Sequence, residues 1–466
     1  MKKLFFKKSL RSKYNGLIAI PYEIKVRDFL SRLLIVYFIL RNKKFGNRKV
    51  IFGERRQLGF FCKKVQLSNY LILNLGVDRN YNYYKDLTAA NGVALSLDEE
   101  GSIITPYEDK INPRQKYSKS CIQFVHKIFA WGNYEKNNYI FHNKNIEKKK
   151  IIISGNPRFD ISKKKFIRSE KNYNKKKILV SFAFGLVNAL VDPKIESDYW
   201  KSKNPLQKKF DEFWQTVYQN QKINFNLYLK DIVKLIEEFP DEKFIIRPHP
   251  IENIKKYNRI KKFSNVTIRN SGPIQDEFNN IKLLIHPGCT TSIEAAFSRI
   301  PSIFYSPKFE KKLIPKATYL VSQVARNYNQ LINILKNNYY PNRLNKIKYY
   351  ISNVKYNSAE VIAEEILKIK IDKVLKFNKN LKIDYLTRFR FISHKVFNKI
   401  KLYFNKENFF SLNKKFKKRD AIKKSHISAT EIKYYLKLFD KIYLQKNYKK
   451  YYTKKINQYV YEIKKK

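Results

Sequence analysis

The sequence predicts an α/β protein with two parallel-sheet domains, followed by a basic helical C-terminal extension. Short apolar segments of strand type alternate with helical segments, which is typical of a parallel sheet covered on both faces. The alternation starts again after a basic connector at 161–177, and the composition changes beyond about residue 371. At 466 residues the chain is also too long for one ordinary core. We therefore expect domains at 1–165 and 166–370 and a tail at 371–466.

The first domain is predicted from a series of short apolar runs. A helical segment at 23–40 follows the first run and carries a polar face. That face consists of Glu23, Lys25, Arg27, Asp28 and Arg32. The strand segments of this domain are 16–21, 49–53, 70–74, 92–97, 127–132 and 150–158.

The second domain repeats the pattern with a predicted amphipathic helix at 225–239, closed by Pro240. Its strand segments are 178–182, 244–246, 266–268, 283–285 and 302–304. The order of strands and helices resembles a second Rossmann-type domain. The sequence contains neither GxGxxG nor a P-loop, so no motif supports a dinucleotide-binding or ATPase function.

The tail at 371–466 is more basic than the rest of the chain. It has 28 Lys and Arg against 7 Asp and Glu, which gives +21 of the total net charge of +58. Aromatic and aliphatic residues alternate with the lysines, as in 431–439. Basic helices of this composition can lie on anionic lipid. The alternative is a solvated helical extension that packs a few aromatic rings on the body of the protein.

The net charge of the whole chain admits two explanations. It favours a polyanionic partner, either nucleic acid or an anionic membrane surface. It also fits a compositional bias toward Lys, Asn, Ile and Tyr. No nucleic-acid-binding motif is recognisable, so no specific nucleic-acid partner is predicted.

The cysteines and the apolar runs indicate a compartment. Cys62, Cys121 and Cys289 are widely spaced, which predicts neither a disulfide framework nor a metal site. The longest apolar run near the N-terminus, 33–40, falls far short of the ~20 residues that a membrane span needs. We expect a cytoplasmic protein, at most peripheral on the inner face of the cytoplasmic membrane.

Two strand segments of the second domain end at His-Pro. The second continues through Gly-Cys-Thr-Thr-Ser into a helix. Ligands of open α/β sheets bind at the carboxyl ends of strands, and a Thr-Thr-Ser helix start supplies hydroxyl and amide donors. This predicts a site for a nucleotide phosphate. Its residues are Arg247, His249, Pro250, His286, Gly288, Thr290, Thr291, Ser292 and Glu294.

Some of these residues have structural alternatives. His249 lies between two prolines, which is not typical of a core histidine. His286 could equally pack under the loop. Glu294 could accept ribose hydroxyls, or it could be a first-turn acid favoured by the helix dipole.

An acidic cluster, Asp98, Glu99 and Glu100, precedes Gly101 in the first domain. Neighbouring carboxylates raise one another's pKa, which suits a general base. We expect Glu99 to act as this base, with Asp98 and Glu100 as alternatives. An exposed acidic turn is the structural alternative.

These segments carry a resemblance to a bacterial family of surface carbohydrate biosynthesis proteins, over most of 17–340. The resemblance lies in 20–28, 97–101, 130–132, 155–160 and the two His-Pro segments. The chain is also similar to the CMP-sugar-using Kdo transferases and bacterial sialyltransferases. Those enzymes carry an acidic motif followed by Gly, then His-Pro, then a Ser/Thr pair. In this chain the same order is formed by Glu99-Glu100-Gly101, His249-Pro250 and Thr290-Thr291.

The resemblance implies a GT-B-like fold, with two Rossmann-type domains facing a cleft, and a glycosyltransferase of cell-surface polysaccharide, lipopolysaccharide or capsule biosynthesis. The donor would be a CMP-activated keto-acid sugar such as Kdo, and the acceptor a glycan or a lipid-linked precursor. Arg158, near Asn156 at the domain crossing, could bind the donor carboxylate or could simply pair with Asp160. No cofactor or metal is expected.

Other functions stay open at this point. The donor could be a UDP-sugar, or the enzyme could be a phosphotransferase of CDP-glycerol type. The second alternative is a non-catalytic protein that binds a polyanion or a membrane surface. The sequence does not decide between inversion and retention at the sugar carbon.

Overall fold

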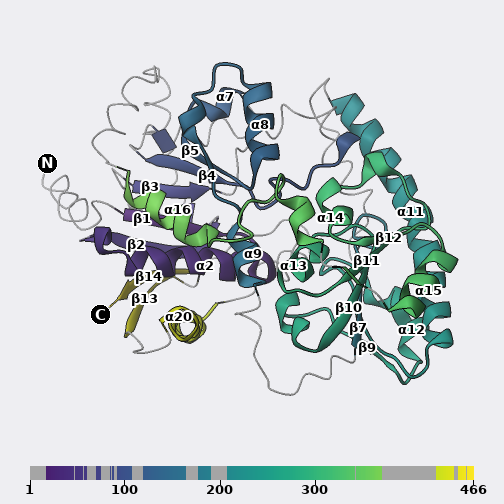
Figure 1. The fold of residues 1–466 in the computed structure, drawn as a ribbon. Coiled ribbons are helices and arrows are strands. Elements are labelled where there is room, and N and C mark those ends of the chain that lie inside the picture. The colour runs from purple at the N-terminus through teal and green to yellow at the C-terminus, as the bar shows by residue number, and fades with distance from the viewer. Residues whose placement is uncertain are drawn as a thin grey trace, which may run out of the picture.

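The computed structural model describes residues 17–163, 177–189, 207–369 and 427–465, with gaps at 47, 56, 60–69, 75–83, 85–86, 89–91, 108–118, 339, 342, 445–449 and 458. Figure 1 shows two halves, each with a sheet flanked by helices. The purple and blue part of the chain forms the first half, and the teal and green part forms most of the second. The yellow C-terminal part lies against the first half.

The first sheet has eight strands in the order β13-β14-β2-β1-β3-β4-β5-β6. Strands β1 to β6 pair in parallel, whereas β14 pairs antiparallel with β2 and β13. Their bounds are β1 Leu17–Tyr22, β2 Lys49–Glu54, β3 Tyr70–Asn74, β4 Val93–Leu97, β5 Val125–Ala130, β6 Ile151–Ile153, β13 Tyr451–Asn457 and β14 Val460–Lys465. Strand β1 is buried along its whole length, as expected for an inner strand of a sheet covered on both faces.

Three helices from distant parts of the sequence pack together on the first sheet. Helix α2 contacts both α16 and α20. Their shared core includes Leu33 and Val36 of α2, Ile362 of α16, and Leu436 and Phe439 of α20. The helical bounds in this half are α2 Lys25–Arg41, η2 Lys43–Phe45, α7 Lys119–Ile122, α8 Asn133–His142, η3 Lys148–Lys150, α9 Pro157–Ile161, α16 Ser358–Leu367 and α20 Ala429–Leu444.

The second sheet has six parallel strands in the order β12-β11-β10-β7-β8-β9. Its strands are β7 Lys177–Ser181, β8 Lys243–Arg247, β9 Val266–Ile268, β10 Ile281–His286, β11 Ser302–Tyr305 and β12 Gln323–Ala325. Its helices are α11 Gln207–Glu238, η5 Ile254–Tyr257, α12 Asn258–Lys261, η6 Ile274–Asp276, η7 Phe278–Asn280, α13 Thr291–Phe297, η8 Lys311–Leu313, α14 Lys316–Leu320, α15 Tyr328–Asn337 and η9 Leu344–Ile347. The predicted helix at 225–239 is the C-terminal part of α11.

The two halves share an apolar cluster where they meet. Trp131 and Phe159 of the first half pack with Ile293 and Phe297 of α13. The Phe159 and Phe297 rings stack with centroids 5.2 Å apart. The returning chain adds a backbone hydrogen bond of 2.8 Å from the Ser352 N–H to the Trp131 carbonyl. The halves are therefore joined by packed side chains as well as by the connecting chain.

The predicted α/β fold class is confirmed, and each predicted strand segment overlaps a strand. The extension contains a helix, α20, and in addition the β13–β14 hairpin, which the sequence analysis did not anticipate. The division at residues 165 and 370 stays a prediction. Helix α16, which falls inside the predicted second domain, packs against α2 of the first half.

Two residues of the predicted polar face of the first helix do not contact solvent. Asp28 and Arg32 are fully buried. The Asp28 carboxyl accepts hydrogen bonds from the backbone N–H groups of Glu23 and Ile24, at 2.9 and 2.7 Å. It therefore holds the start of α2, where the N-cap residue Ile24 has no side-chain acceptor. Burial raises the Asp28 pKa to about 6, with the neighbouring Arg27 opposing the shift.

Candidate functional site

The strand order of the second sheet changes direction between β7 and β10. Such a switch point is where open α/β sheets bind ligands, beyond the carboxyl ends of the strands. Ser181, at the end of β7, lies with its Oγ 3.2 Å from the Cys289 Sγ of the loop after β10. The end of β7 and the loop after β10 therefore meet at this edge of the sheet. We call this edge, with the loops that follow β7, β8 and β10, the crevice.

His249 lies in the loop after β8, and its side chain is exposed at this edge. A Cβ on Gly185, in the loop after β7, would come within 3.5 Å of His249 Nδ1 and 2.7 Å of the Ile251 side chain. Only a glycine allows the two loops this close approach. Pro250 follows in the same turn and is half-buried. The structure thus places His249 beside the switch point.

Arg247 lies at the end of β8 but turns away from the crevice. Its guanidinium donates to the carbonyl of Ser271 at 2.6 Å and to that of Gly272. Glu277 lies 3.5 Å away, and burial lowers the Arg247 pKa. Arg247 therefore organises the 269–277 loop, and its donors are used within the protein.

His286 is fully buried under the loop after β10. Its Nδ1 accepts the Gly288 N–H at 3.1 Å, and its Nε2 lies 2.9 Å from the Ser322 Oγ. Burial lowers its pKa to about 3, so the ring is neutral near pH 7. This is the structural alternative that the sequence left open. Gly288 has a left-handed φ of 111°, which lets the chain turn over the ring.

Helix α13 begins directly after this turn. Thr290 and Thr291 are half-buried at its start. Ser292 is fully buried, and its hydroxyl donates to the carbonyls of Cys289 and Thr318, at 2.9 and 3.0 Å. Thr290 and Thr291 therefore keep partly exposed side chains at the start of α13, whereas the Ser292 hydroxyl fixes the loop.

Arg158 of α9 joins the two halves at this helix. Its Nε and Nη2 donate to the Glu294 carboxylate at 2.8 and 3.2 Å, and its Nη2 also donates to Thr290 Oγ1 at 3.1 Å. The Gln275 amide donates to the same carboxylate at 3.0 Å. The partner of Arg158 is thus Glu294, and the predicted alternative pairing with Asp160 was wrong.

Asn156 precedes Arg158 and is fully buried. Its side-chain oxygen accepts the Arg158 N–H at 2.8 Å, which caps the start of α9. Its amide group donates to the Asp98 carbonyl at 3.3 Å and lies 3.4 Å from a Glu99 oxygen. Asn156 therefore connects the acidic cluster to the Arg158–Glu294 pair.

The three acidic residues have different surroundings. Glu99 is buried and pairs with the fully buried Arg32 at 2.7 Å. Asp98 is half-buried, and its Oδ1 accepts the Glu100 N–H at 2.9 Å. The Glu100 side chain is 71% exposed and lies 3.4 Å from Arg27. The expected base, Glu99, is thus the least accessible carboxylate of the cluster.

Gly101 closes the acidic turn for a steric reason. A Cβ at this position would lie 2.7 Å from Cδ1 of Trp131 and would also collide with the carboxylate of Glu135. That carboxylate is fully buried and accepts the Trp131 N–H at 2.7 Å. The glycine therefore lets the acidic turn lie directly on the start of α8.

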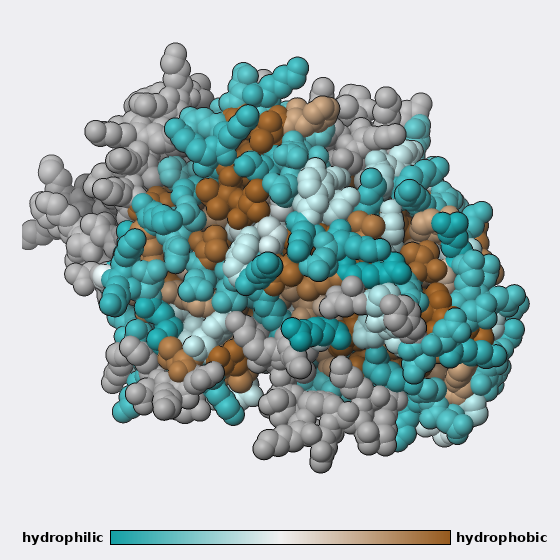
Figure 2. Space-filling model, in the orientation of Figure 1, coloured by the Kyte–Doolittle hydropathy of each residue, from teal (hydrophilic) through white to brown (hydrophobic). Residues whose placement is uncertain are grey.

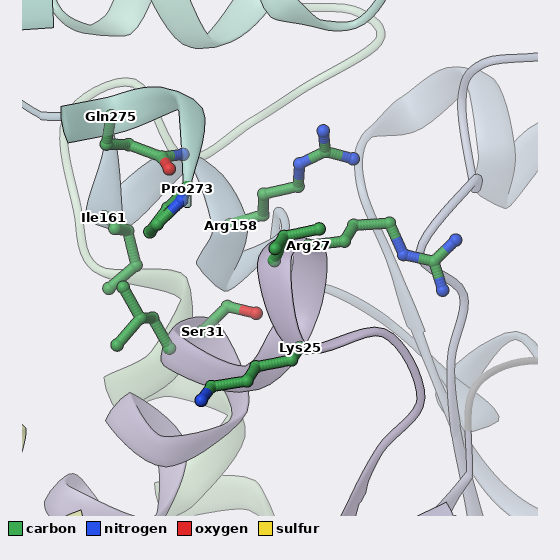
Figure 3. A pocket seen from close by; sticks show the side chains of 9 residues that line it. Lys25, Arg27, Ser31, Arg158, Ile161, Pro273 and Gln275 are labelled. Carbon is green, nitrogen blue, oxygen red and sulfur yellow. The ribbon is translucent and has the colours of Figure 1, made fainter. Parts of the chain in front are cut away.

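A small pocket with room for about one water molecule lies between the halves, beside Arg158. It is lined by Lys25, Val26, Arg27, Leu30, Ser31, Arg158, Ile161, Pro273 and Gln275. In Figure 3 the guanidinium groups of Arg27 and Arg158 and the Lys25 ammonium group point away from its middle. Lys25 pairs with Glu431 of α20 at 2.9 Å, so the C-terminal extension reaches this pocket.

Sequence reasoning missed Arg32 and Gln275. Arg32 was assigned only to the polar face of a helix, and Gln275 lies in a segment without a motif. The available signal was the spacing of Arg32 in an otherwise apolar helix segment, which a buried ion pair explains. Within the described ranges, no group of acidic, His and Cys side chains could hold a metal ion.

No protein-family model matches this sequence, and no curated protein does. Several solved structures are similar. UDP-GlcNAc 2-epimerase of Methanocaldococcus jannaschii, crystallised with UDP-GlcNAc and UDP, is 14% identical, with a TM-score of 0.45 over 75% of this chain and 99% of that one. The Neisseria meningitidis UDP-GlcNAc 2-epimerase bound to UDP-GlcNAc is 13% identical, with a TM-score of 0.48 over 76% of this chain and 99% of that one. The wall teichoic acid polymerase TagF is 12% identical, with a TM-score of 0.45 over 80% of this chain and 94% of that one. At these identities and TM-scores, nothing about the activity of this chain follows.

Proposed function

We propose that this protein is a glycosyltransferase of cell-surface polysaccharide biosynthesis that uses a nucleotide-activated sugar. One observation carries the proposal: the Arg158–Glu294 pair brings the acidic turn of the first half next to the switch point of the second. Glycosyl transfer needs donors that stabilise the departing phosphate and a carboxylate that activates the acceptor. In this proposal the second half contributes the donors to the phosphate, and the acidic turn of the first half contributes the carboxylate.

In this proposal the crevice binds the nucleotide. His249, Thr290 and Thr291 lie at this edge and would donate to the phosphate. Glu294 would accept ribose hydroxyls after exchanging its contact with Arg158. The freed Arg158 would bind the carboxylate of a keto-acid sugar such as Kdo, which motivates a CMP-linked donor.

The acid/base role is assigned to the acidic turn. Glu99 stays our first candidate because Asn156 and Arg32 orient its carboxyl group. The exposed Glu100 and the half-buried Asp98 are the alternatives. Removing the Glu99 carboxylate with Ala would leave Arg32 buried without its counter-charge, which is costly for the fold. Transfer assays should therefore compare Glu99→Gln, Glu100→Gln and Asp98→Asn.

The first test is thermal stabilisation by CMP, CDP and UDP at matched concentration and high salt. A ligand that binds only the folded state adds about 2.7 kcal/mol at a hundredfold excess over its Kd. We expect CMP to stabilise the wild type and to lose this effect in His249→Ala. His142→Ala, on α8 of the first half, is the matched control and should respond like the wild type.

The nucleotides separate the donor classes. A preference for UDP would support a transferase with a UDP-sugar donor in place of the CMP-sugar. A preference for CDP would favour a phosphotransferase of CDP-glycerol type. No response to any of the three nucleotides would sink the proposal.

We also propose contact with an anionic membrane surface through the outer face of α20. Lys433, Lys437 and Lys441 are exposed at a spacing of four residues, and Tyr434 between them is 50% exposed. Figure 2 shows a largely hydrophilic face with scattered apolar groups. No helix in the described parts of the chain is long and apolar enough to cross a membrane.

Vesicle binding tests this contact. Replacing the three α20 lysines with Glu should weaken binding to phosphatidylglycerol vesicles by about 1 kcal/mol or more for each lysine. Replacing Lys255, Lys256 and Lys261 with Glu changes the net charge equally in the second half and is the control. Equal losses in both triple variants would contradict a role for α20.

A further inference from the structure

Backbone hydrogen bonds join the loop after β7 to the loop after β8, within a few residues of His249. The Asn253 N–H donates to the Asn188 carbonyl at 2.8 Å, and Ala189 forms a bridge with Glu252. The Glu252 N–H in turn donates to the His249 carbonyl at 2.8 Å. These contacts set how the two loops lie at the crevice.

The Glu252 carboxyl group lies at the centre of this arrangement and is 1% exposed. Its Oε1 accepts the Phe184 N–H of the β7 loop at 2.6 Å, and its Oε2 accepts the Tyr257 hydroxyl of η5. The His249 N–H and the Asn188 side chain hydrogen-bond to the same carboxyl group. One side chain thus takes donors from both loops and from the element behind them.

The surroundings of this carboxyl group are aromatic. Phe182, Phe184, Tyr228 and Tyr257 pack together, with ring centroids 4.8 to 6.1 Å apart in the contacts of Phe182. The titratable groups that face Glu252 are the Tyr257 and Tyr228 phenols, and burial raises the pKa of both. Among the described residues no Lys or Arg forms an ion pair with it. Burial raises the Glu252 pKa to about 7, against the hydrogen bonds that lower it.

We propose that Glu252 is a positioning residue of the crevice, whose carboxyl group holds the β7 loop to the β8 loop. Because this carboxyl group is buried among aromatic rings, its ionised form is costly in the closed state, and deprotonation favours opening of both loops. The fastening stands on the contacts above. Its consequence for nucleotide binding rests on the proposed function, because His249 is the group that the fastened loops hold in place.

The direction of the pH effect follows from the two states of the loops. When the loops open, water reaches the carboxyl group and its pKa returns toward 4.5; when they are closed, it is about 7. Opening therefore releases a proton between these values, so a rising pH favours opening across this window. Above about pH 7 both states are ionised and the effect levels off.

Amide hydrogen exchange, corrected for the intrinsic effect of pH, tests the proposal without any ligand. In the wild type, protection of 182–189 and 247–253 should fall together between pH 5 and 7, by up to about tenfold for each pH unit, and then level off. Protection of β10 in the same half should not follow this course, which separates loop opening from global unfolding.

Three variants sharpen the result. Glu252→Gln cannot ionise and should remove the pH dependence in both loops. Glu242→Gln, at the other end of β8, is the matched control and should behave like the wild type. Tyr257→Phe removes one donor to the carboxylate and should enlarge the loss of protection; it also keeps the test decisive if Glu252→Gln does not fold.

The outcomes are distinct. Protection that is independent of pH in the wild type, or unchanged in both Glu252→Gln and Tyr257→Phe, overturns the proposal. Coupled loss in the two loops that Glu252→Gln abolishes supports it. If no nucleotide stabilises the wild type, the proposed function fails by itself, while the exchange result still decides the role of Glu252. If a nucleotide binds, its affinity should weaken more between pH 5 and 7 in the wild type than in Glu252→Gln, because the titration of His249 and of the phosphate is common to both proteins.

Discussion

Removing residues 427–466 is expected to unfold the first half of the protein. The deletion takes away α20 and the β13–β14 hairpin, and Figure 1 shows both lying against α2 and β2. Strand β14 pairs with β2, so its loss exposes the hydrogen-bonding edge of an inner strand. It also strips buried side chains from the core: Ile432, Leu436, Phe439, Tyr461 and Ile463. We expect an insoluble or non-cooperatively unfolding product.

A milder variant tests the same claim quantitatively. Leu436→Ala should lower the free energy of unfolding by about 2 to 5 kcal/mol, because it opens a cavity against α2. Lys437→Ala, the next residue on the outer face, should change it by less than about 0.5 kcal/mol. Urea unfolding of both variants supplies the measurement. A deletion variant that keeps the wild-type urea midpoint would show that the extension is not part of the core.

This result changes how tail deletions are interpreted. A membrane-surface protein without catalysis would lose its function when the tail is removed, whereas changes at His249 would leave it intact. Because α20 and the hairpin complete the first sheet, deletion would also abolish an enzyme. Only substitutions on the outer face of α20 separate the two functions.

The strands of both sheets could be predicted because their apolar runs are short and interrupted by polar turns. The hairpin could not. Strand β13 is rich in Lys and Tyr, its buried and exposed positions do not alternate regularly, and no glycine marks the turn before β14. The pairing of β14 with β2 is set by a partner about 400 residues away in the sequence. Periodicity within a window carries no information on such a contact.

The position of the candidate residues at the strand ends could be predicted, and the direction of each side chain could not. His-Pro and Thr-Thr mark the carboxyl ends of β8 and β10, which the sheet brings together. Whether each side chain faces the crevice depends on packing beneath the loop. His286 hydrogen-bonds to the buried Ser322 and Ser292 to the carbonyl of Thr318. Ser322 and Thr318 do not belong to a motif. The burial of Arg32 with Glu99 likewise depends on a contact between distant segments.

Breaking the Arg158–Glu294 pair on one side is expected to destabilise the protein strongly. The side chains are 12% and 2% exposed, so Arg158→Met leaves a buried carboxylate with only the Gln275 amide nearby. Losing one partner of a buried pair costs about 3 to 5 kcal/mol. Adding Glu294→Gln removes the stranded charge, so the double variant should recover at least about 2 kcal/mol of that loss.

Urea unfolding of the wild type, both single variants and the double variant measures this coupling. Lys234→Met breaks an exposed pair with Glu238, with side chains 57% and 40% exposed, and should cost less than about 1 kcal/mol. The pair is a polar link between the acidic turn and the second half, so its coupling energy also reports on the closure of the proposed site. If Arg158→Met costs no more than the exposed control, Glu294 is solvated in solution, and the halves are held together by the apolar cluster around Phe159 and Phe297 and by the hydrogen bonds of Ser162 with Gln275 and Ser298.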